Sequence, residues 1–292
     1  MKLFAGLEQI VRTDHPLAPH TWLKLGGPAT YFIEPVDVEQ LADVVRRCGE
    51  NEIPMHVLGS GANVLIDDAG VKGAVIHLAG EQFKKVAATP SGLRAGAGAD
   101  AGKLVLQCVR EGLSGIEGLT GIPGTVGGCV KMNAGGAFGD VGNVVESVEV
   151  MNDNGETFTR HRSDLAFAYR SSNIGARFIL AATFGMTEDD PHRILKQVKQ
   201  IWIYKKNTQP LGYRNAGCIF KNPRGLSAGA LIDRAGMKEQ RVGGAHVSQK
   251  HANFILADKG AKASDVLKLI NTIREAVYKK SQVYLELEIE VW

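Results

Sequence analysis

The sequence predicts a mixed α+β protein of two or three lobes, and three observations support this fold class. The chain has 292 residues, 44% of them hydrophobic, which is enough to bury more than one core. Short apolar runs typical of strands alternate with runs of helical period. The 35 glycines gather in the connections between these runs, where loops of special backbone geometry are expected.

Composition excludes several classes of protein. Charged residues make up 22% of the chain and the formal net charge is only +3, which argues against a nucleic-acid-binding surface. No apolar run approaches the ~18 residues of a membrane helix, and residues 1–7 do not resemble a signal peptide. The cysteines Cys48, Cys108, Cys129 and Cys218 lack the spacing of a zinc site or a disulfide framework. We therefore expect a cytoplasmic protein with reduced thiols, no metal site and no membrane insertion.

The first 73 residues predict a β-α-β unit. We expect strands at 31–36, 55–58 and 64–66, and a helix from Asp37, its N-cap, to about residue 52. Four apolar residues share one face of that helix, namely Leu41, Val44, Val45 and Cys48.

Residues 74–188 predict a second lobe rich in strands. Strands are expected at 74–79, 83–88 and 177–186, and a hairpin is expected at 144–152 and 156–161 around Asn154-Gly155. A helix is expected over 101–111, ended by Gly112.

A third region is expected from residue 189 to the C-terminus. Its helices are predicted at 192–204, 227–235 and 264–280, the last capped by Ser264 with Leu267, Ile270, Ile273 and Val277 on its apolar face. Apolar residues at every second position predict a final strand over 283–292.

Two glycine-rich loops are candidates for binding phosphates. Each can expose successive backbone N–H groups, and a short helix beginning near Thr125 would add its N-terminus to the second loop. A single loop of this kind more often only makes a tight turn. Two such loops in one chain favour a pyrophosphate site. The candidate cofactor-binding residues are Leu58, Gly59, Ser60, Gly61, Ala62 and Asn63 in the first loop, and Gly121, Ile122, Pro123, Gly124, Thr125, Gly127, Gly128, Asn133, Ala134 and Gly135 in the second.

Two other nucleotide-binding motifs fit poorly. Gly96-x-Gly98-x-x-Ala101 precedes a predicted helix, but the acidic residue of a Rossmann fingerprint does not follow at a strand end. Ala97 stands where a P-loop needs glycine, and Leu104 stands where it needs Ser or Thr.

Seven blocks in order resemble one enzyme family over nearly the whole chain, the UDP-N-acetylenolpyruvoylglucosamine reductases of peptidoglycan precursor synthesis. The final strand with its glutamates is one block, and the other six are Pro16–Pro35, Leu58–Asn63, Gly121–Gly136, Ala168–Ser171, Gly217–Pro223 and Val247–Phe254. The short segment between Arg170 and Cys218 resembles the compact subtype, which lacks a tyrosine-bearing substrate loop.

The resemblance implies a vanillyl-alcohol-oxidase-type (PCMH-type) FAD-binding fold of two lobes, 1–73 and 74–188. It also implies a C-terminal α+β substrate-binding domain, 189–292, whose final strand 283–292 is a candidate to return to the FAD lobe. The implied enzyme is a monomer that binds FAD non-covalently. NADPH reduces the flavin, and hydride then passes from flavin N5 to the terminal enolpyruvyl carbon of UDP-N-acetylglucosamine enolpyruvate.

The resemblance assigns the catalytic roles to three residues. Arg170 would stabilise the enolate through the substrate carboxylate, as a permanently charged two-donor group can. Cys218 stands where many relatives carry a proton-donating serine, and a thiol is acidic enough to donate that proton. From spacing alone Glu286, Glu288 and Glu290 are equivalent on one strand face; the family motif selects Glu288.

The resemblance also implies which cations and amides bind the diphosphate and sugar of the substrate. They are Lys205, Lys206, Gly217, Lys221 and Asn222, with Lys250 and His251 as weaker candidates. A solvated surface is the alternative for each lysine.

Two rival functions stay open at this level. One is another flavin oxidoreductase of the same fold, and the other is a catalytically silent nucleotide-sugar binder. The intact Arg170 and Glu288 argue against the second.

Overall fold

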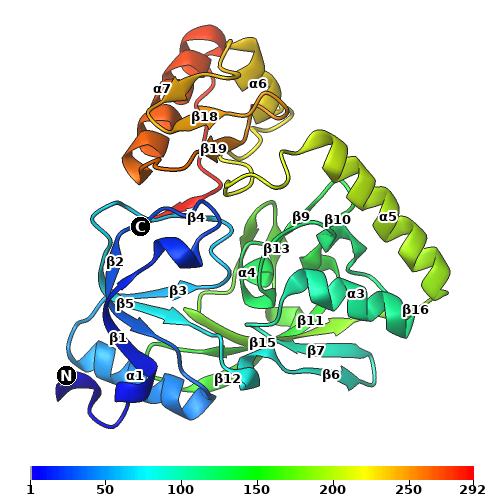
Figure 1. The fold of residues 1–292 in the computed structure, drawn as a ribbon. Coiled ribbons are helices and arrows are strands. Elements are labelled where there is room, and N and C mark those ends of the chain that lie inside the picture. Colours follow the sequence, from blue (N-terminus) through cyan, green and yellow to red (C-terminus); the bar gives the residue numbers. More distant parts are fainter. Residues whose placement is uncertain (1) are drawn as a thin grey trace. The chain divides into compact units, whose positions relative to one another are not determined.

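The computed structural model describes residues 2–292, which divide into two compact units (Figure 1). The first unit comprises the N-terminal residues through Thr13, Thr30–Gly59 and Gly73–Lys205. The second comprises Asp14–Ala29, Ser60–Lys72 and Lys206–Trp292. The predicted parts, 1–73, 74–188 and 189–292, follow the chain in order, whereas the second unit gathers two early segments with the C-terminal region. Short early segments carry too little composition signal to reveal such an exchange.

One sheet has the strand order β1-β2-β5-β3. Its strands are β1 (Val11–Pro16), β2 (Pro28–Ile33), β5 (Val71–His77) and β3 (Met55–Leu58). β3 and β5 are parallel, with Met55 opposite Ala74, so a crossover connection is required between strands of this kind.

Helix α1 (Val38–Glu50) confirms the prediction for its segment. The Asp37 carboxylate accepts a 2.8 Å hydrogen bond from the amide of Gln40 and caps the helix. The Gln40 side chain accepts a hydrogen bond from the amide of Val36. It therefore does not form a capping box, in which it would accept from the amide of Asp37. The four residues of the predicted apolar face are the buried residues of α1.

A five-stranded antiparallel sheet forms the other half of the first unit, in the order β12-β11-β15-β7-β6. Its strands are β12 (Thr157–His161), β11 (Val145–Met151), β15 (Phe178–Gly185), β7 (Gly92–Gly96) and β6 (Val86–Thr89). The hairpin around Asn154-Gly155 is confirmed by the pairing of β11 with β12. The predicted strand at 83–88 is wrong in its first part, because residues 81–84 form helix α2 (Glu81–Lys84), which buries Phe83.

Three further helices and several short elements complete the first unit. The helices are α3 (Ala101–Glu111), α4 (Val126–Lys131) and α5 (Pro191–Thr208), and α3 ends at Gly112 in the left-handed conformation, as predicted. α5 continues four residues past its predicted end. The short strands are β8 (Leu113–Ser114), β9 (Gly135–Gly136), β10 (Gly139–Asp140), β13 (Phe167–Ala168), β14 (Ser171–Ser172) and β16 (Thr187–Glu188). Single 3-10 turns occur at η1 (Lys2–Phe4), η2 (Glu8–Ile10), η4 (Glu117–Leu119), η5 (Val141–Asn143) and η6 (Arg162–Asp164).

The second unit packs helices against a small antiparallel sheet (Figure 1). The sheet is β17 (Arg241–Val242), β18 (Ala245–Val247) and β19 (Ile255–Ala257), and the helices are α6 (Ala228–Arg234) and α7 (Ala263–Ser281). The unit also contains η3 (Ala18–His20), β4 (Val64–Leu65) and β20 (Glu290–Val291). Ile270, Ile273 and Val277 on α7 are buried in its core, and Leu267 is partly buried against it.

Two predictions for the second unit need correction. α7 begins at Ala263, and its first amides donate to the Asp68 carboxylate at 2.8 and 3.0 Å, so Ser264 is not the cap. The C-terminal segment is not one continuous strand: a bridge joins Leu287 to Phe220, and only β20 forms a ladder, parallel to β4. Among residues 2–292, no helix has both the length and the apolar character needed to span a bilayer.

Candidate active site

The second glycine-rich loop leads directly into α4, as predicted. The Thr125 hydroxyl accepts a hydrogen bond of 3.4 Å from the amide of Gly128 and caps the helix. Asn133 and Gly135 follow the other end of the helix. The short helix α4 therefore joins the second glycine-rich loop to the segment that contains Asn133 and Gly135.

Four glycines of the predicted loops stand where a side chain would not fit, namely Gly59, Gly61, Gly127 and Gly135. A Cβ added to Gly59 would lie 2.7 Å from the Thr125 hydroxyl, so the end of β3 closely approaches the start of α4 within the first unit. A Cβ on Gly135 would overlap the Asp140 carboxylate. The absence of a side chain at these positions therefore lets neighbouring segments of the chain pack closely against the two loops.

Thr120, immediately before the second loop, has a buried hydroxyl with no hydrogen-bond partner among residues 2–292. A buried polar atom without a partner is costly and calls for an explanation. A bound dinucleotide would supply one, and the glycine-rich loop that follows Thr120 can present backbone N–H groups to phosphates, so both features fit an FAD site at this loop.

Lys205, a predicted substrate-binding residue, is buried in the first unit. Its ammonium donates a 2.6 Å hydrogen bond to the carbonyl oxygen of Thr120. Burial and the nearby positive charge of Arg170 lower the pKa of Lys205 to about 8, partly opposed by Cys129. The structure thus places this lysine beneath the glycine loop, where it holds the backbone.

Arg170 lies in a two-residue turn between β13 and β14, with a left-handed φ of +53°. Its guanidinium is 5.0 Å from the centre of the Tyr169 ring. The turn is anchored through Asn133, whose side-chain amide donates to the Ala168 carbonyl at 2.9 Å. The predicted catalytic arginine and the predicted cofactor loop are therefore linked within one unit.

The first glycine loop continues into the second unit, where it meets the C-terminal segment. The Asn63 side-chain amide donates to the Glu288 carbonyl at 3.1 Å, and the Glu290 amide donates to the Asn63 carbonyl at 3.0 Å. Residues 60–63 and Glu288, predicted as parts of one site, are thus neighbours within this unit.

The residue after Cys218, Ile219, is hydrogen-bonded to the same C-terminal segment. The Ile219 carbonyl accepts a 2.8 Å hydrogen bond from the amide of Glu288. Among the three candidate glutamates, Glu288 is half-buried, whereas Glu286 and Glu290 are exposed. The structure therefore distinguishes Glu288 from the two residues that spacing alone left equivalent.

Asn253 is a structural residue of this site that sequence reasoning missed. Its buried side chain accepts from the Phe220 amide at 3.0 Å and donates to the Phe220 carbonyl at 2.8 Å. It thereby fixes the segment that carries Cys218. The only available signal was its presence in the block Val247–Phe254.

The remaining substrate candidates lie in the second unit. Lys206 is exposed, and its carbonyl accepts a hydrogen bond of 2.5 Å from the Lys250 ammonium. Gly217 has φ of +74°, and its amide donates to the Asn215 side chain at 2.9 Å. Asn222 accepts from the first amide of α6, that of Ala228, at 2.9 Å, and Lys221 is half-buried beside it.

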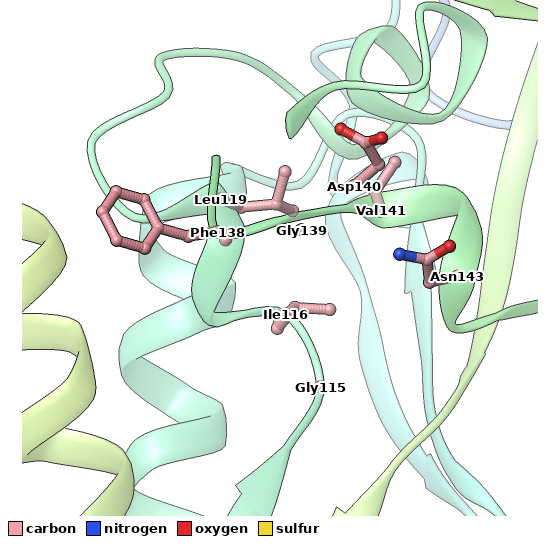
Figure 2. Close-up of a pocket in the computed structure, with 9 residues that line it drawn as sticks. Gly115, Ile116, Leu119, Phe138, Gly139, Asp140, Val141 and Asn143 are labelled. Carbon is pink, nitrogen blue, oxygen red and sulfur yellow. The ribbon is translucent and has the colours of Figure 1, made fainter. Parts of the chain in front are cut away.

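A separate small cavity of about 200 Å³ lies between η4 and the β9–β10 hairpin (Figure 2). Figure 2 shows Phe138 at the edge of the cavity, pointing away from Asp140 and Asn143. The Phe138 ring packs edge-on against the Tyr204 ring, with the two ring centres 5.3 Å apart. The cavity is smaller than the roughly 300–1,000 Å³ typical of ligand pockets, so it does not accommodate a dinucleotide.

The alternative glycine motif at Gly96 has a structural role. The motif begins at the last residue of β7. This strand belongs to an antiparallel sheet, whereas a Rossmann site needs parallel strands. Asp100, within the motif, caps α3 by accepting a hydrogen bond of 2.7 Å from the Lys103 amide. Within residues 2–292, no cluster of three or more His, Cys, Asp or Glu side chains is placed to hold a metal ion.

Comparison with known proteins agrees with this geometry. An FAD binding domain model matches residues 29–160, and the model of the C-terminal domain of UDP-N-acetylenolpyruvoylglucosamine reductase matches residues 209–292. The chain is 40% identical over 284 residues to UDP-N-acetylenolpyruvoylglucosamine reductase 2 of Symbiobacterium thermophilum, covering 97% of this chain and 92% of that protein.

Solved structures give the same result. The crystal structure of the reductase from Thermus caldophilus superposes with a TM-score of 0.83 at 39% identity, over 97% of this chain and 98% of that one. A glucose dehydrogenase, Phl p 4.0202, superposes with a TM-score of 0.50 at 14% identity, over 65% of this chain and 45% of that one, and shows a shared fold only.

Fold and site together define an FAD-binding protein of the vanillyl-alcohol-oxidase type with an added C-terminal domain. The chain belongs to the UDP-N-acetylenolpyruvoylglucosamine reductase family.

Proposed function

We propose that the protein is an FAD- and NADPH-dependent reductase that converts UDP-N-acetylglucosamine enolpyruvate to UDP-N-acetylmuramate, a step of peptidoglycan precursor synthesis. Family membership over 97% of the chain is the observation that carries this proposal. The FAD binding domain match over residues 29–160 supports FAD as the cofactor, and we propose that it is bound without a covalent tether.

The reaction adds a hydride and a proton, in total two electrons and two protons, to a carbon–carbon double bond. When bound, FAD relays a hydride equivalent from NADPH to the terminal enolpyruvyl carbon. The negative charge that develops toward the substrate carboxylate must be stabilised, and the adjacent carbon must receive a proton. NADPH and one proton are consumed, and NADP⁺ and the lactyl ether are formed.

Three residues of this chain are proposed to meet those needs. Arg170 stabilises the enolate with a charge that persists at all working pH values. Cys218 carries the proton that is donated to the carbon next to the carboxylate. Glu288 helps to hold or protonate the enol. Asn253 and Asn215 fix the backbone on either side of Cys218.

Lys206, Lys221, Asn222 and Gly217 are proposed to contact the nucleotide-sugar part of the substrate. Lys205 is also proposed to support the second glycine loop, because its ammonium donates a hydrogen bond to the Thr120 carbonyl. Its contact with the substrate stays a prediction.

The direct test is NADPH oxidation by the purified yellow protein, with and without the enolpyruvyl substrate. Substrate-dependent oxidation with one lactyl product per NADPH is expected. Flavin that stays with acid-precipitated protein, together with turnover of alcohols, would favour a rival oxidoreductase. Bound substrate without turnover would favour the silent nucleotide-sugar binder. That the protein acts as a cytoplasmic monomer stays a prediction, which sedimentation and fractionation can test.

A further inference from the structure

The turn that carries Arg170 needs support from outside itself. β13 and β14 pair through Phe167 with Ser172 and Ala168 with Ser171, leaving only Tyr169 and Arg170 in the turn. Arg170 adopts a φ of +53°, a region that side chains with a Cβ occupy at a cost. A hairpin of two short strands is marginal alone. Its geometry therefore depends on what it packs against.

Asn133 supplies the central support. Its side-chain Nδ2 donates to the Ala168 carbonyl at 2.9 Å, and its Oδ1 accepts from the Gly142 amide at 2.9 Å. The residue is only 4% exposed. Because both polar ends of the side chain bind protein backbone, the side chain clamps the arginine turn to the segment that follows α4.

A second set of contacts joins the same hairpin to the end of α4. The Ser172 hydroxyl donates to the Lys131 carbonyl at 2.8 Å, and the Lys131 ammonium donates to the Ile174 carbonyl at 2.6 Å. The other end of α4 is the Thr125 cap of the glycine loop. One short helix thus has the cofactor loop at its start and the arginine turn at its end (Figure 1).

We propose that Asn133 is a positioning residue that sets Arg170 for catalysis by clamping the Ala168 carbonyl to the cofactor-binding segment. The inference rests on the proposed function, in which Arg170 stabilises the enolate. Small displacements of a catalytic group, of about 1 Å, can reduce rates by ~10²-fold. Loss of this clamp should therefore slow the step that uses Arg170 and spare the step that does not.

Asn133→Asp tests the clamp with almost no change in shape. The carboxylate keeps the acceptor for Gly142 but opposes the Ala168 carbonyl with a negative charge instead of a donor. In stopped-flow experiments on the FAD-loaded enzyme, we expect reoxidation of reduced flavin by the enolpyruvyl substrate to slow by about 10-fold or more at pH 8. Flavin reduction by NADPH should stay within about twofold, because Arg170 has no part in it.

The pH dependence of this variant separates positioning from damage. Below its pKa, the introduced carboxyl group carries a proton that it can donate to Ala168, so the clamp is restored in acid and lost as the pH rises. The ratio of variant to wild-type reoxidation rates should therefore rise as the pH falls from 8 to 5. Asn133→Gly, which tolerates the local φ of +44° but has no side chain, should be slow at every pH.

Asn173→Asp is the matched control. Asn173 makes the same pair of contacts on the same hairpin, accepting from the Ala166 amide and donating to the Asp164 carbonyl, each at 2.9 Å. It is exposed, and these contacts do not reach α4. We expect both half-reactions of this variant to stay within about twofold of wild type, in line with other exposed surface changes.

Three outcomes would overturn the inference: wild-type reoxidation in both Asn133 variants, a loss in Asn133→Asp without recovery in acid, or an equal loss in Asn173→Asp. Arg170→Ala separates this failure from failure of the proposed function. If Arg170→Ala reoxidises at the wild-type rate, the catalytic role of Arg170 is wrong. If Arg170→Ala is slow and the Asn133 variants are not, only the positioning role is wrong.

Discussion

The amide of Glu288 donates a 2.8 Å hydrogen bond to the carbonyl of Ile219, the residue that follows Cys218. The Glu288 carbonyl in turn accepts from the Asn63 side chain. A single residue of the C-terminal segment thus joins the first glycine loop to the segment of the proposed proton donor. This arrangement leads to the first of four predictions.

Glu288→Gln should reduce turnover by about 10²-fold or more, the typical effect of losing a group that takes part in proton transfer. Glu286→Gln and Glu290→Gln are the controls, since both side chains are exposed on the same segment. They should retain turnover within about twofold. Steady-state NADPH oxidation measures all three, and similar losses in the three variants would contradict the assignment of Glu288.

Cys218→Ala should abolish substrate turnover and leave NADPH-driven flavin reduction intact, because the thiol is needed only when the enol is protonated. Cys218→Ser should keep measurable turnover, since a hydroxyl can take the same place. Stopped-flow absorbance of the flavin separates the two half-reactions. Reoxidation of Cys218→Ala by substrate at the wild-type rate would rule out Cys218 as the proton donor.

Lys205 should make stability depend on pH in the alkaline range. Its pKa is lowered from an ordinary value near 10.5 to about 8, mainly by burial. Between these values the unfolded chain binds more protons than the folded chain, so the free energy of unfolding should rise with pH. Urea denaturation measures this. Between pH 7 and pH 10, the free energy of unfolding of the wild type should rise by about 1–3 kcal/mol relative to that of Lys205→Met. A difference that stays constant with pH would show that the ammonium is not desolvated.

Gly135→Ala and Gly136→Ala test the narrow part of the second loop with adjacent residues. An added Cβ at Gly135 would overlap the Asp140 carboxylate, whereas at Gly136 nothing lies within 4 Å. Gly135→Ala should weaken FAD binding by about tenfold or more, since overpacking of a tight site costs about 1–3 kcal/mol. Gly136→Ala should bind FAD normally. Flavin fluorescence titration of the apoprotein measures both, and equal affinities would show that the loop adapts.

Local signals in the sequence determined the elements that depend on neighbouring residues. Asp37 capped α1, Gly112 ended α3, and Thr125 began α4, because caps and left-handed ends are contacts over three or four positions. The family motif selected Glu288 among three equivalent glutamates, and the structure separates it from the other two by its burial. Family and cofactor were likewise readable from ordered blocks of residues.

Only the tertiary structure decided the features that join distant parts of the chain. The amides at the start of α7 bind Asp68, almost two hundred residues away, and not Ser264 as a local reading predicts. The side chain of Asn133, a predicted cofactor-binding residue, binds the backbone of Ala168 and Gly142 and so links the segment after α4 to the arginine turn. Such contacts leave no periodicity in the sequence, because the chain between their partners can have any pattern that folds. The glycine loops were found from sequence, but how they are connected to Arg170 and Glu288 was determined by the fold.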